Sequence, residues 1–386
     1  MKYISIFQYW DELYAILCFP LAALHFQRKI VVKNEDKYIF YILIALFVFI
    51  SIGLVSNKIY RYQKSAAIIQ DLFINLKFFM GIATTYFLFK NFKINIYKNR
   101  IRFHCKLLIT LYLILVLQNK ITHFFSVADM RFGLNAEKIF FNHPTELASA
   151  TFFLLLVLII SSTNISNSIF PIGMASIVIL LTLRFKAIAT VMLFLYMYFI
   201  VISGKKIKLI YFFPIIPFII SVGWKEFYFY FFSDVSMITA RGALSNISLK
   251  VARDLFPFGS GFGTFASWMS GIYYSPVYLL YGIDTVWGLS ENWAGLVSDV
   301  FWPMVIAQNG FIGFILYIFI IICLFKIIFQ CSKIDKRLYL AGMGALIYLL
   351  VSSIAESAFV NPLALPLAFV IGLCICTYKQ KERGIN

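Results

Sequence analysis

Residues Phe311–Phe325 read FIGFILYIFIIICLF, an apolar run that contains no charged side chain. A helix needs about 20 mostly apolar residues to cross the hydrocarbon core of a bilayer. The longer segment Asp299–Phe325, of which this run is the end, meets that requirement. The stretch therefore predicts a helix that spans a membrane.

The same length criterion identifies further segments on both sides of this one. With Asp299–Phe325 they make about eleven, so we expect an all-α, polytopic integral membrane protein with about eleven transmembrane helices, forming one domain over residues 1–386. The other segments are Ile4–His25, Tyr38–Val55, Ala67–Phe89, Leu107–Gln118, Glu146–Ser162, Ile165–Leu183, Ala187–Ser203, Ile207–Val222, Leu338–Ala355 and Leu363–Thr377.

The composition excludes an ordinary soluble domain. Hydrophobic residues make up 61% of the chain and charged residues 13%, with a mean hydropathy of +0.86. A typical soluble domain is about half apolar and about a quarter charged. A soluble core of this size has no room for so much apolar surface, whereas a lipid bilayer accepts it directly.

The formal charge of +17 predicts an orientation in the membrane and no nucleic-acid partner. The basic residues stand in short runs between the apolar segments, and such runs favour the cytoplasmic side. Eleven crossings place most of these runs on one side; Lys58, Arg61 and Lys64 fall on the other. The cytoplasmic runs are Arg28–Lys37, Lys90–Lys106, Lys205–Lys208, Lys326–Arg337 and Lys379–Arg383.

Two connections on the opposite, outer side are long. One covers about residues 119–145. The other, residues 223–298, is the one outer segment large enough to fold over the membrane domain, and it holds most of the polar chemistry of the second half of the chain. Because long loops with their own aromatic content are usually functional, we expect a large extracytoplasmic loop that has a function of its own and is not a spacer.

Arg184 and Lys186 occupy a very short connection between two apolar segments. Both side chains must lie at the membrane surface or just inside it, where a charge is costly and usually functional. The alternative is a pair of interface anchors whose long side chains reach back to water. Because basic residues are disfavoured on the outer side, we interpret the pair as part of a site for an anion.

Further cations lie in the large loop. Arg241, Lys250 and Arg253 are suited to charge-assisted hydrogen bonds with a diphosphate. They precede the segment Pro257-Phe-Gly-Ser-Gly-Phe-Gly-Thr-Phe265. Its glycines permit a close approach of the backbone to a ligand or to another chain segment, and a tight structural turn is the alternative interpretation. The candidate glycines are Gly259, Gly261 and Gly263.

Aromatic residues gather farther along the same loop, with Tyr274 and Trp287 as the candidates for sugar binding. Aromatic faces stack on the C–H surface of a sugar, but packing at the membrane interface explains the same composition equally well.

Two carboxylates are predicted at the outer face. Asp299 lies where the long loop re-enters the membrane, and Glu356 lies at the outer end of the segment Leu338–Ala355. Burial raises the pKa of a carboxylate towards working pH, so either residue is a candidate general base. The alternatives are a helix cap for Asp299 and a buried ion pair for Glu356.

The six cysteines and four histidines show no metal-ligand spacing. We therefore expect the cysteines to be small buried hydrophobic residues, and we expect no metal site and no cofactor.

Four features together resemble the O-antigen ligase/polymerase superfamily, and Wzy-type polymerases of O-antigen or capsular polysaccharide in particular. They are the long outer loop with spaced arginines, the Pro-Phe-Gly-x-Gly-Phe-Gly element at Pro257, Asp299 ahead of Gly310-Phe-Ile-Gly313, and Arg184 in an earlier outer connection. The ligases have His where Asp299 stands, and Asn, Ser or Gln where Val300 stands. This chain departs from the ligases at both positions.

The resemblance implies an enzyme of the bacterial inner membrane whose active face is extracytoplasmic. It would transfer a growing glycan from undecaprenyl diphosphate to a single oligosaccharide repeat unit on the same carrier. A flippase and a chain-length regulator are implied partners, and Arg184 and Arg241 would contact the lipid diphosphate. Two alternatives stay open: an O-antigen ligase-type transferase, and a transporter or flippase of lipid-linked sugars.

Overall fold

The computed structural model describes residues 37–90, 96–127, 129–131, 133–204 and 236–382, together with Pro217, Trp224 and Tyr228. The chain is 72% helical and almost without strands; the described residues form one antiparallel pair, β1 (Met130–Arg131) with β2 (Leu134–Asn135). This bears out the all-α class. The predicted segment Ile4–His25, with Cys18, lies outside the described residues, and so does Ile207–Val222 apart from Pro217.

Six of the described helices are long and apolar enough to cross a membrane. The predicted segments at these places are therefore confirmed as helices of that kind, whereas the total of eleven crossings stays a prediction. The six are α2 (Lys37–Tyr60), α3 (Ser65–Phe89), α4 (Lys98–Thr122), α5 (Pro144–Ser161), α7 (Phe185–Ile202) and α12 (Trp302–Cys331).

Three more helices occupy predicted segments but are shorter or more polar. A 3-10 turn, η4 (Ser166–Ser168), leads into α6 (Ile169–Leu181). Helix α13 (Lys336–Ser352) has 17 residues, and α14 (Ala364–Glu382) ends in a turn that carries Lys379 and Lys381. Most side chains of α13 and α14 are buried, so these two helices form the centre of the bundle.

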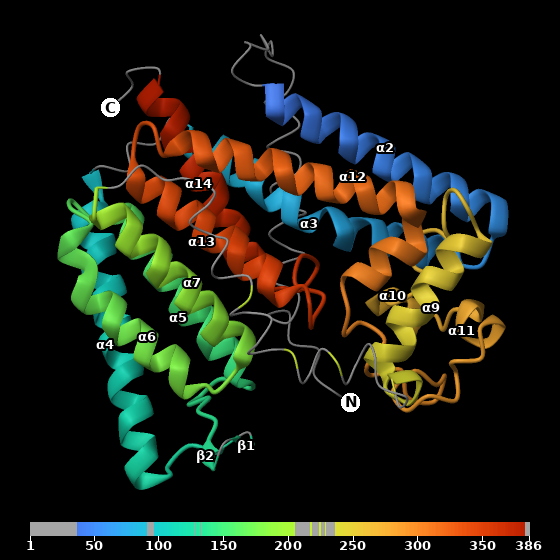
Figure 1. Cartoon of the computed structure of the whole chain (residues 1–386), viewed down its shortest axis with the longest axis horizontal. Coiled ribbons are helices and arrows are strands. Elements are labelled where there is room, and N and C mark those ends of the chain that lie inside the picture. The colour runs from blue at the N-terminus through green and yellow to red at the C-terminus, as the bar shows by residue number, and fades with distance from the viewer. Residues whose placement is uncertain are drawn as a thin grey trace.

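The helices form two groups joined through this centre (Figure 1). Helix α12 packs along α2, and α14 packs along α3. On the other side, α4 packs against α5 and α6, and α13 contacts both α5 and α7. Because α13 and α14 also pack on each other, one continuous apolar core connects the two groups.

A tight turn separates α6 from α7. Leu183 has a left-handed backbone with φ of 52°, and Arg184 is extended, so no helix runs through this point. The turn places Arg184 immediately before α7 and Lys186 within its first turn. The short connection predicted between these segments is therefore present.

The described part of the loop 223–298 is folded. After the 3-10 turn η6 (Ser236–Ile238) it forms α9 (Ala240–Asp254), α10 (Trp268–Ile272) and α11 (Pro276–Leu280). Helix α9 packs against α12, and α10 packs against α3, so this segment is docked on the bundle (Figure 1).

Helix α12 is kinked at Gly310, whose φ of 65° and ψ of −173° no helix accommodates. A Cβ atom at this position would stand 2.4 Å from the carbonyl oxygen of Pro257. Glycine is needed here for both reasons. The kink is where the glycine-rich segment of the loop meets the bundle.

Candidate functional site

Arg184 is held at the α6–α7 turn and is 9% exposed. Its Nη2 lies 2.8 Å from Oδ1 of Asp129, and Nε of Arg131 lies 2.9 Å from Oδ2 of the same carboxylate. Burial acts to raise the pKa of Asp129, but the hydrogen bond from Arg131 and the charge of Arg184 outweigh it and lower the pKa. Asp129 is therefore a stable anion. The Nε–H of Arg184 is buried without a partner among the described residues.

Lys186 pairs with Glu356. The Lys186 ammonium donates a hydrogen bond to Oε2 of Glu356, and both side chains are mostly buried. Glu356 lies just beyond α13, where its backbone N–H donates to the carbonyl of Ser352 over 3.0 Å. The ion pair foreseen as one alternative for Glu356 is thus present, with Lys186 as its partner.

Arg241 and Asp299 form a third pair. Arg241 is in the first turn of α9, and its Nη2 lies 3.2 Å from Oδ2 of Asp299, with each side chain about one-third exposed. The residue that caps α12 is Phe301, and no side chain caps that helix end. The helix-cap alternative for Asp299 is therefore wrong, because the carboxylate is directed to Arg241 instead.

These three pairs form one group at one end of the bundle. The charges of Glu356, Arg241 and Arg184 all act on Lys186. We call the group the charged cluster; it consists of Arg184, Lys186, Arg241, Asp129, Asp299 and Glu356. Its members come from five places far apart in sequence: the connection from α4 to β1, the α6–α7 turn, the start of α9, the approach to α12 and the end of α13. The structure thus brings all four candidate catalytic residues together.

The sequence reasoning missed His143, which borders the charged cluster. His143 caps the N-terminus of α5: its Nδ1 accepts a hydrogen bond from the Thr145 N–H over 3.2 Å. This bond requires the neutral tautomer that carries its proton on Nε2. Partial burial and the charges of Arg184 and Lys186 lower the pKa of His143. The ring is therefore a neutral donor beside the arginine and lysine.

The other predicted cations lie elsewhere. Arg253 is twelve residues along α9 from Arg241, about 18 Å at 1.5 Å per residue. Lys250 and Arg253 are exposed, and the Lys250 ammonium lies 5.6 Å from the centre of the Tyr281 ring. These two side chains do not join the charged cluster.

The glycine-rich segment binds other parts of the chain. The N–H of Gly261 donates to the Gln308 carbonyl and the N–H of Gly263 donates to Oδ2 of Asp71, each over 2.8 Å. A Cβ at Gly259 would stand 2.5 Å from the Ala307 carbonyl oxygen. The sequence left open whether the backbone at Gly259, Gly261 and Gly263 approaches a ligand or another chain segment. The structure shows a close approach to other chain segments.

The candidate aromatic residues also lie outside the charged cluster. The Tyr274 hydroxyl donates to the Leu289 carbonyl over 2.8 Å. Burial, with the charges of Asp284 and Glu291, raises the pKa of Tyr274 to about 12. Trp287 is 72% exposed, and its ring centre lies 4.3 Å from that of Trp293. Trp287 is thus available at the surface, while Tyr274 is committed to holding the loop together.

No protein-family model matches this chain, and no curated protein matches it. The five cysteines within the described residues are buried, as predicted.

Proposed function

We propose that this protein polymerises oligosaccharide repeat units linked to a lipid diphosphate, taken to be undecaprenyl diphosphate, in the synthesis of O-antigen or capsule. The observation that carries the proposal is the convergence of Arg184, Lys186 and Arg241, with three carboxylates, at one end of an apolar helical bundle. A lipid diphosphate fits this location because it has an anionic headgroup for the cations and a long apolar tail for the apolar bundle.

The guanidinium groups are suited to the leaving group. A diphosphate offers several oxygens to Arg184 and Arg241, and guanidinium binds such oxygens in pairs. Arg184 also keeps a buried Nε–H without a partner in the described structure, which a phosphate oxygen would satisfy. His143 adds a neutral donor at the same place. These groups would stabilise the charge that develops as the diphosphate departs.

In the proposed reaction a hydroxyl of the acceptor repeat unit attacks the anomeric carbon of the donor glycan. The new C–O bond forms while the bond from that carbon to the lipid diphosphate breaks, and the diphosphate leaves with the bonding electrons. The hydroxyl proton passes to a carboxylate, for which Asp299 is our first choice and Glu356 the second. The protein holds both lipid-linked substrates in line for this exchange.

The ion pairs predict an order for the steps of the proposed reaction, with donor binding before proton transfer. Each of the three cations has a carboxylate partner: Asp129 for Arg184, Glu356 for Lys186 and Asp299 for Arg241. A diphosphate that engages Arg241 competes with Asp299 for the same donors. Binding of the donor would thereby release the Asp299 carboxylate to accept the proton of the acceptor hydroxyl.

The transporter alternative has less support. Charges within a membrane helix typify transporters, and α3 carries two that are buried, Asp71 and Lys77. The Asp71 Oδ2 accepts the Gly263 N–H over 2.8 Å and the Asn75 amide over 3.3 Å. Asp71 therefore has a structural use, which is to anchor the glycine-rich segment against α3.

The test uses cells that lack the gene and carry wild-type protein, Arg184→Ala or Arg241→Ala. Polymerase activity predicts a ladder of chain lengths with wild type and products of one repeat unit with either variant, while both proteins remain in the membrane. Arg100→Ala is the matched control, because Arg100 is an exposed arginine on α4 at the opposite end of the bundle. Accumulation of full-length, carrier-linked polymer in the deletion strain would indicate a ligase instead, and a full ladder from both variants would refute the role of these arginines.

A further inference from the structure

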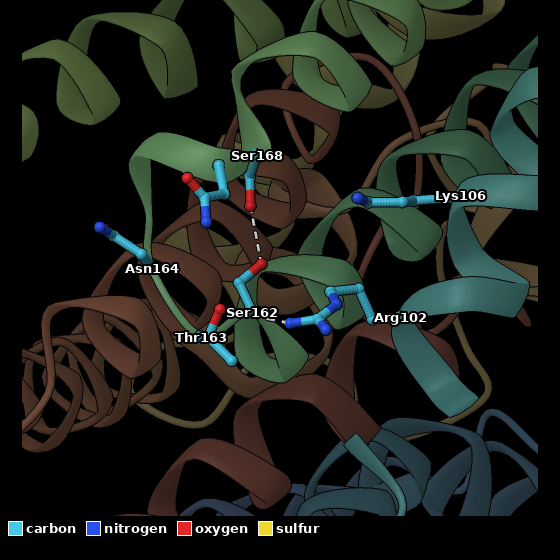
Figure 2. A pocket seen from close by; sticks show the side chains of 7 residues that line it. Arg102, Lys106, Ser162, Thr163, Asn164 and Ser168 are labelled. Carbon is cyan, nitrogen blue, oxygen red and sulfur yellow. Dashed lines mark hydrogen bonds between the residues drawn. The ribbon is translucent and has the colours of Figure 1, made fainter. Parts of the chain in front are cut away.

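A polar pocket of about 180 Å³ lies at the other end of the bundle. Arg102 and Lys106 of α4 and the connection from α5 to α6 line it, with Ser162, Thr163 and Ser168 among the lining residues (Figure 2). Helix α5 begins beside the charged cluster and ends at this pocket. Its 18 residues place the two about 27 Å apart.

Among the described residues, no carboxylate forms an ion pair with the two cations of the pocket. Arg102 donates to Oδ1 of Asn99 over 2.9 Å and makes a long contact of 3.4 Å with the Thr163 hydroxyl, both neutral acceptors. Lys106 is exposed and forms no ion pair within the part of the chain that the structure describes. In Figure 2 both side chains extend from α4 towards the serines and Thr163. The pocket therefore carries a positive charge that no side chain in the described ranges balances.

The acidic side chain that caps the start of α13 is used elsewhere. Asp335 is hydrogen-bonded to Arg337 over 2.7 Å and to Lys381 over 2.6 Å. Burial acts to raise the pKa of Asp335, but these two cations hold it well below its usual range. Arg337 in turn donates to the carbonyls of Ser162 and Thr163. Arg337, held in place by Asp335, thus fixes the α5–α6 connection. The Asp335 carboxylate is engaged there and does not neutralise Arg102 or Lys106.

The rest of the lining is suited to an anion with several oxygens. The hydroxyls of Ser162 and Ser168 lie 2.7 Å apart and are hydrogen-bonded to each other. Thr163, Asn164 and Asn167 add a hydroxyl and two side-chain amides to the same lining. Together with Arg102 and Lys106, these side chains can donate hydrogen bonds to the oxygens of an anion.

Exposed apolar side chains flank the pocket. Phe103 and Leu107 of α4 are 62% and 54% exposed, and Ile169 and Phe170 of α6 are 59% and 73% exposed. A soluble phosphate makes no use of such side chains, whereas the acyl chains of a lipid cover them. We propose that this pocket binds the phosphate of an anionic phospholipid, whose acyl chains lie along α4 and α6. The proposal does not depend on the reaction at the charged cluster.

The pocket lies at an end of the bundle that is rich in basic residues, which favours an anionic ligand. Lys98 lies within electrostatic range of Arg337 and Lys381, so many cations gather here. Basic clusters beside membrane helices bind anionic headgroups, and each Lys or Arg near an anionic surface contributes about fivefold in affinity. The loss of two would weaken binding about thirtyfold.

The test measures lipid retention by native mass spectrometry of the purified full-length protein. The probes are phosphatidylglycerol and, as the zwitterionic comparison, phosphatidylcholine. We expect wild type to retain phosphatidylglycerol in preference, and Arg102→Gln/Lys106→Gln to lose about thirtyfold in affinity. Arg102→Lys, which keeps the charge, should retain most of the binding. Thermal unfolding of each variant verifies that the fold is intact.

The matched control is Arg100→Gln/Lys333→Gln, which removes two exposed cations of the basic runs that do not line the pocket. Wild-type lipid binding by this control supports a defined site. An equal loss in both double variants would overturn the proposal in favour of a diffuse basic surface, and unchanged binding by Arg102→Gln/Lys106→Gln would also overturn it. Inorganic phosphate and glycerol phosphate form the last arm: binding of either as tightly as the lipid would contradict the lipid as the source of the phosphate.

Discussion

The ammonium of Lys186 in the first turn of α7 is hydrogen-bonded to the carboxylate of Glu356, which lies 170 residues later, just beyond α13. Around this pair the structure gathers Arg184, Arg241 and their carboxylates. An apolar bundle that maintains three cations and three carboxylates at one end carries an electrostatic cost, because charges there are partly withdrawn from water. The anionic substrate proposed for this cluster would offset that cost when it binds.

The Lys186–Glu356 pair is expected to show strong coupling in stability. Lys186→Met leaves the Glu356 carboxylate without its partner, and Glu356→Gln leaves the ammonium without its own, so each change should destabilise the protein by about 2 kcal/mol. The double variant removes both charges and should recover most of that loss. Thermal unfolding in detergent measures all four proteins, and additive losses would show that the two side chains do not interact.

Arg241 should be sensitive to a change that retains its charge. Arg241→Lys keeps the positive charge but loses the paired donors of guanidinium, so we expect activity to fall at least tenfold if the diphosphate is bound through two oxygens. Arg253→Ala, about 18 Å farther along α9, should have a much smaller effect. Polymer formed per unit time by membranes measures both. Full activity of Arg241→Lys would reduce the role of Arg241 to that of a point charge.

Gly261 should tolerate no side chain. Its φ is 93°, and a Cβ would stand 2.5 Å from the side-chain amide of Asn57, so Gly261→Ala should destabilise the protein by about 2–3 kcal/mol. Gly173 is the matched control, because a Cβ there meets no atom within 4 Å and Gly173→Ala lies in helix α6. A neutral result for Gly261→Ala in thermal unfolding would contradict the structural role of the glycine-rich segment.

His143 should make stability depend on pH in one direction. Its pKa in the folded protein is lowered, so the unfolded chain binds the proton more readily. The contribution is fully present above about pH 6.5 and is lost as pH falls through the lower pKa of the folded state. Protonation of Nδ1 also removes the hydrogen bond that this atom accepts from the Thr145 N–H. The loss should stay below about 1 kcal/mol, since His143 is only partly buried and water screens its charge.

His143→Asn tests this pH dependence. Asn is a good helix cap that does not titrate, so the variant should lose less stability than wild type between pH 7 and pH 5. The measurement is the unfolding temperature across that range. An identical slope for the two proteins would assign the pH dependence to other groups.

The length of apolar segments predicted helix bounds well where the helix has no charged residues and poorly where charged residues lie at its end. The run Phe311–Phe325 is helical as expected, but α4 begins at Lys98, earlier than the predicted Leu107. The basic residues Lys98–Lys106 interrupt the apolar pattern, yet they lie on a helix that continues past it. Hydropathy detects the part of a helix that faces lipid, and a helix end at the membrane surface escapes it.

Residues of the candidate site could be predicted where the local sequence alone made a charge unusual. Arg184 and Lys186 stood in a connection too short to leave the membrane surface, and both belong to the charged cluster. Asp129 was not found, because its partner Arg184 is 55 residues away and only the folded chain brings them together. The same limit applies to Gly259. A glycine indicates that the backbone closely approaches another group, which the sequence left open as a ligand or another chain segment. The structure identifies that group as the Ala307 carbonyl.

The most direct test of the account is binding of undecaprenyl diphosphate to the purified protein, compared among wild type, Arg184→Ala, Arg241→Ala and the control Arg100→Ala. We expect wild type and Arg100→Ala to bind the lipid diphosphate alike, and the other two to lose at least tenfold in affinity while they unfold at temperatures near that of wild type. Equal binding by all four proteins would contradict the claim that the charged cluster holds the diphosphate.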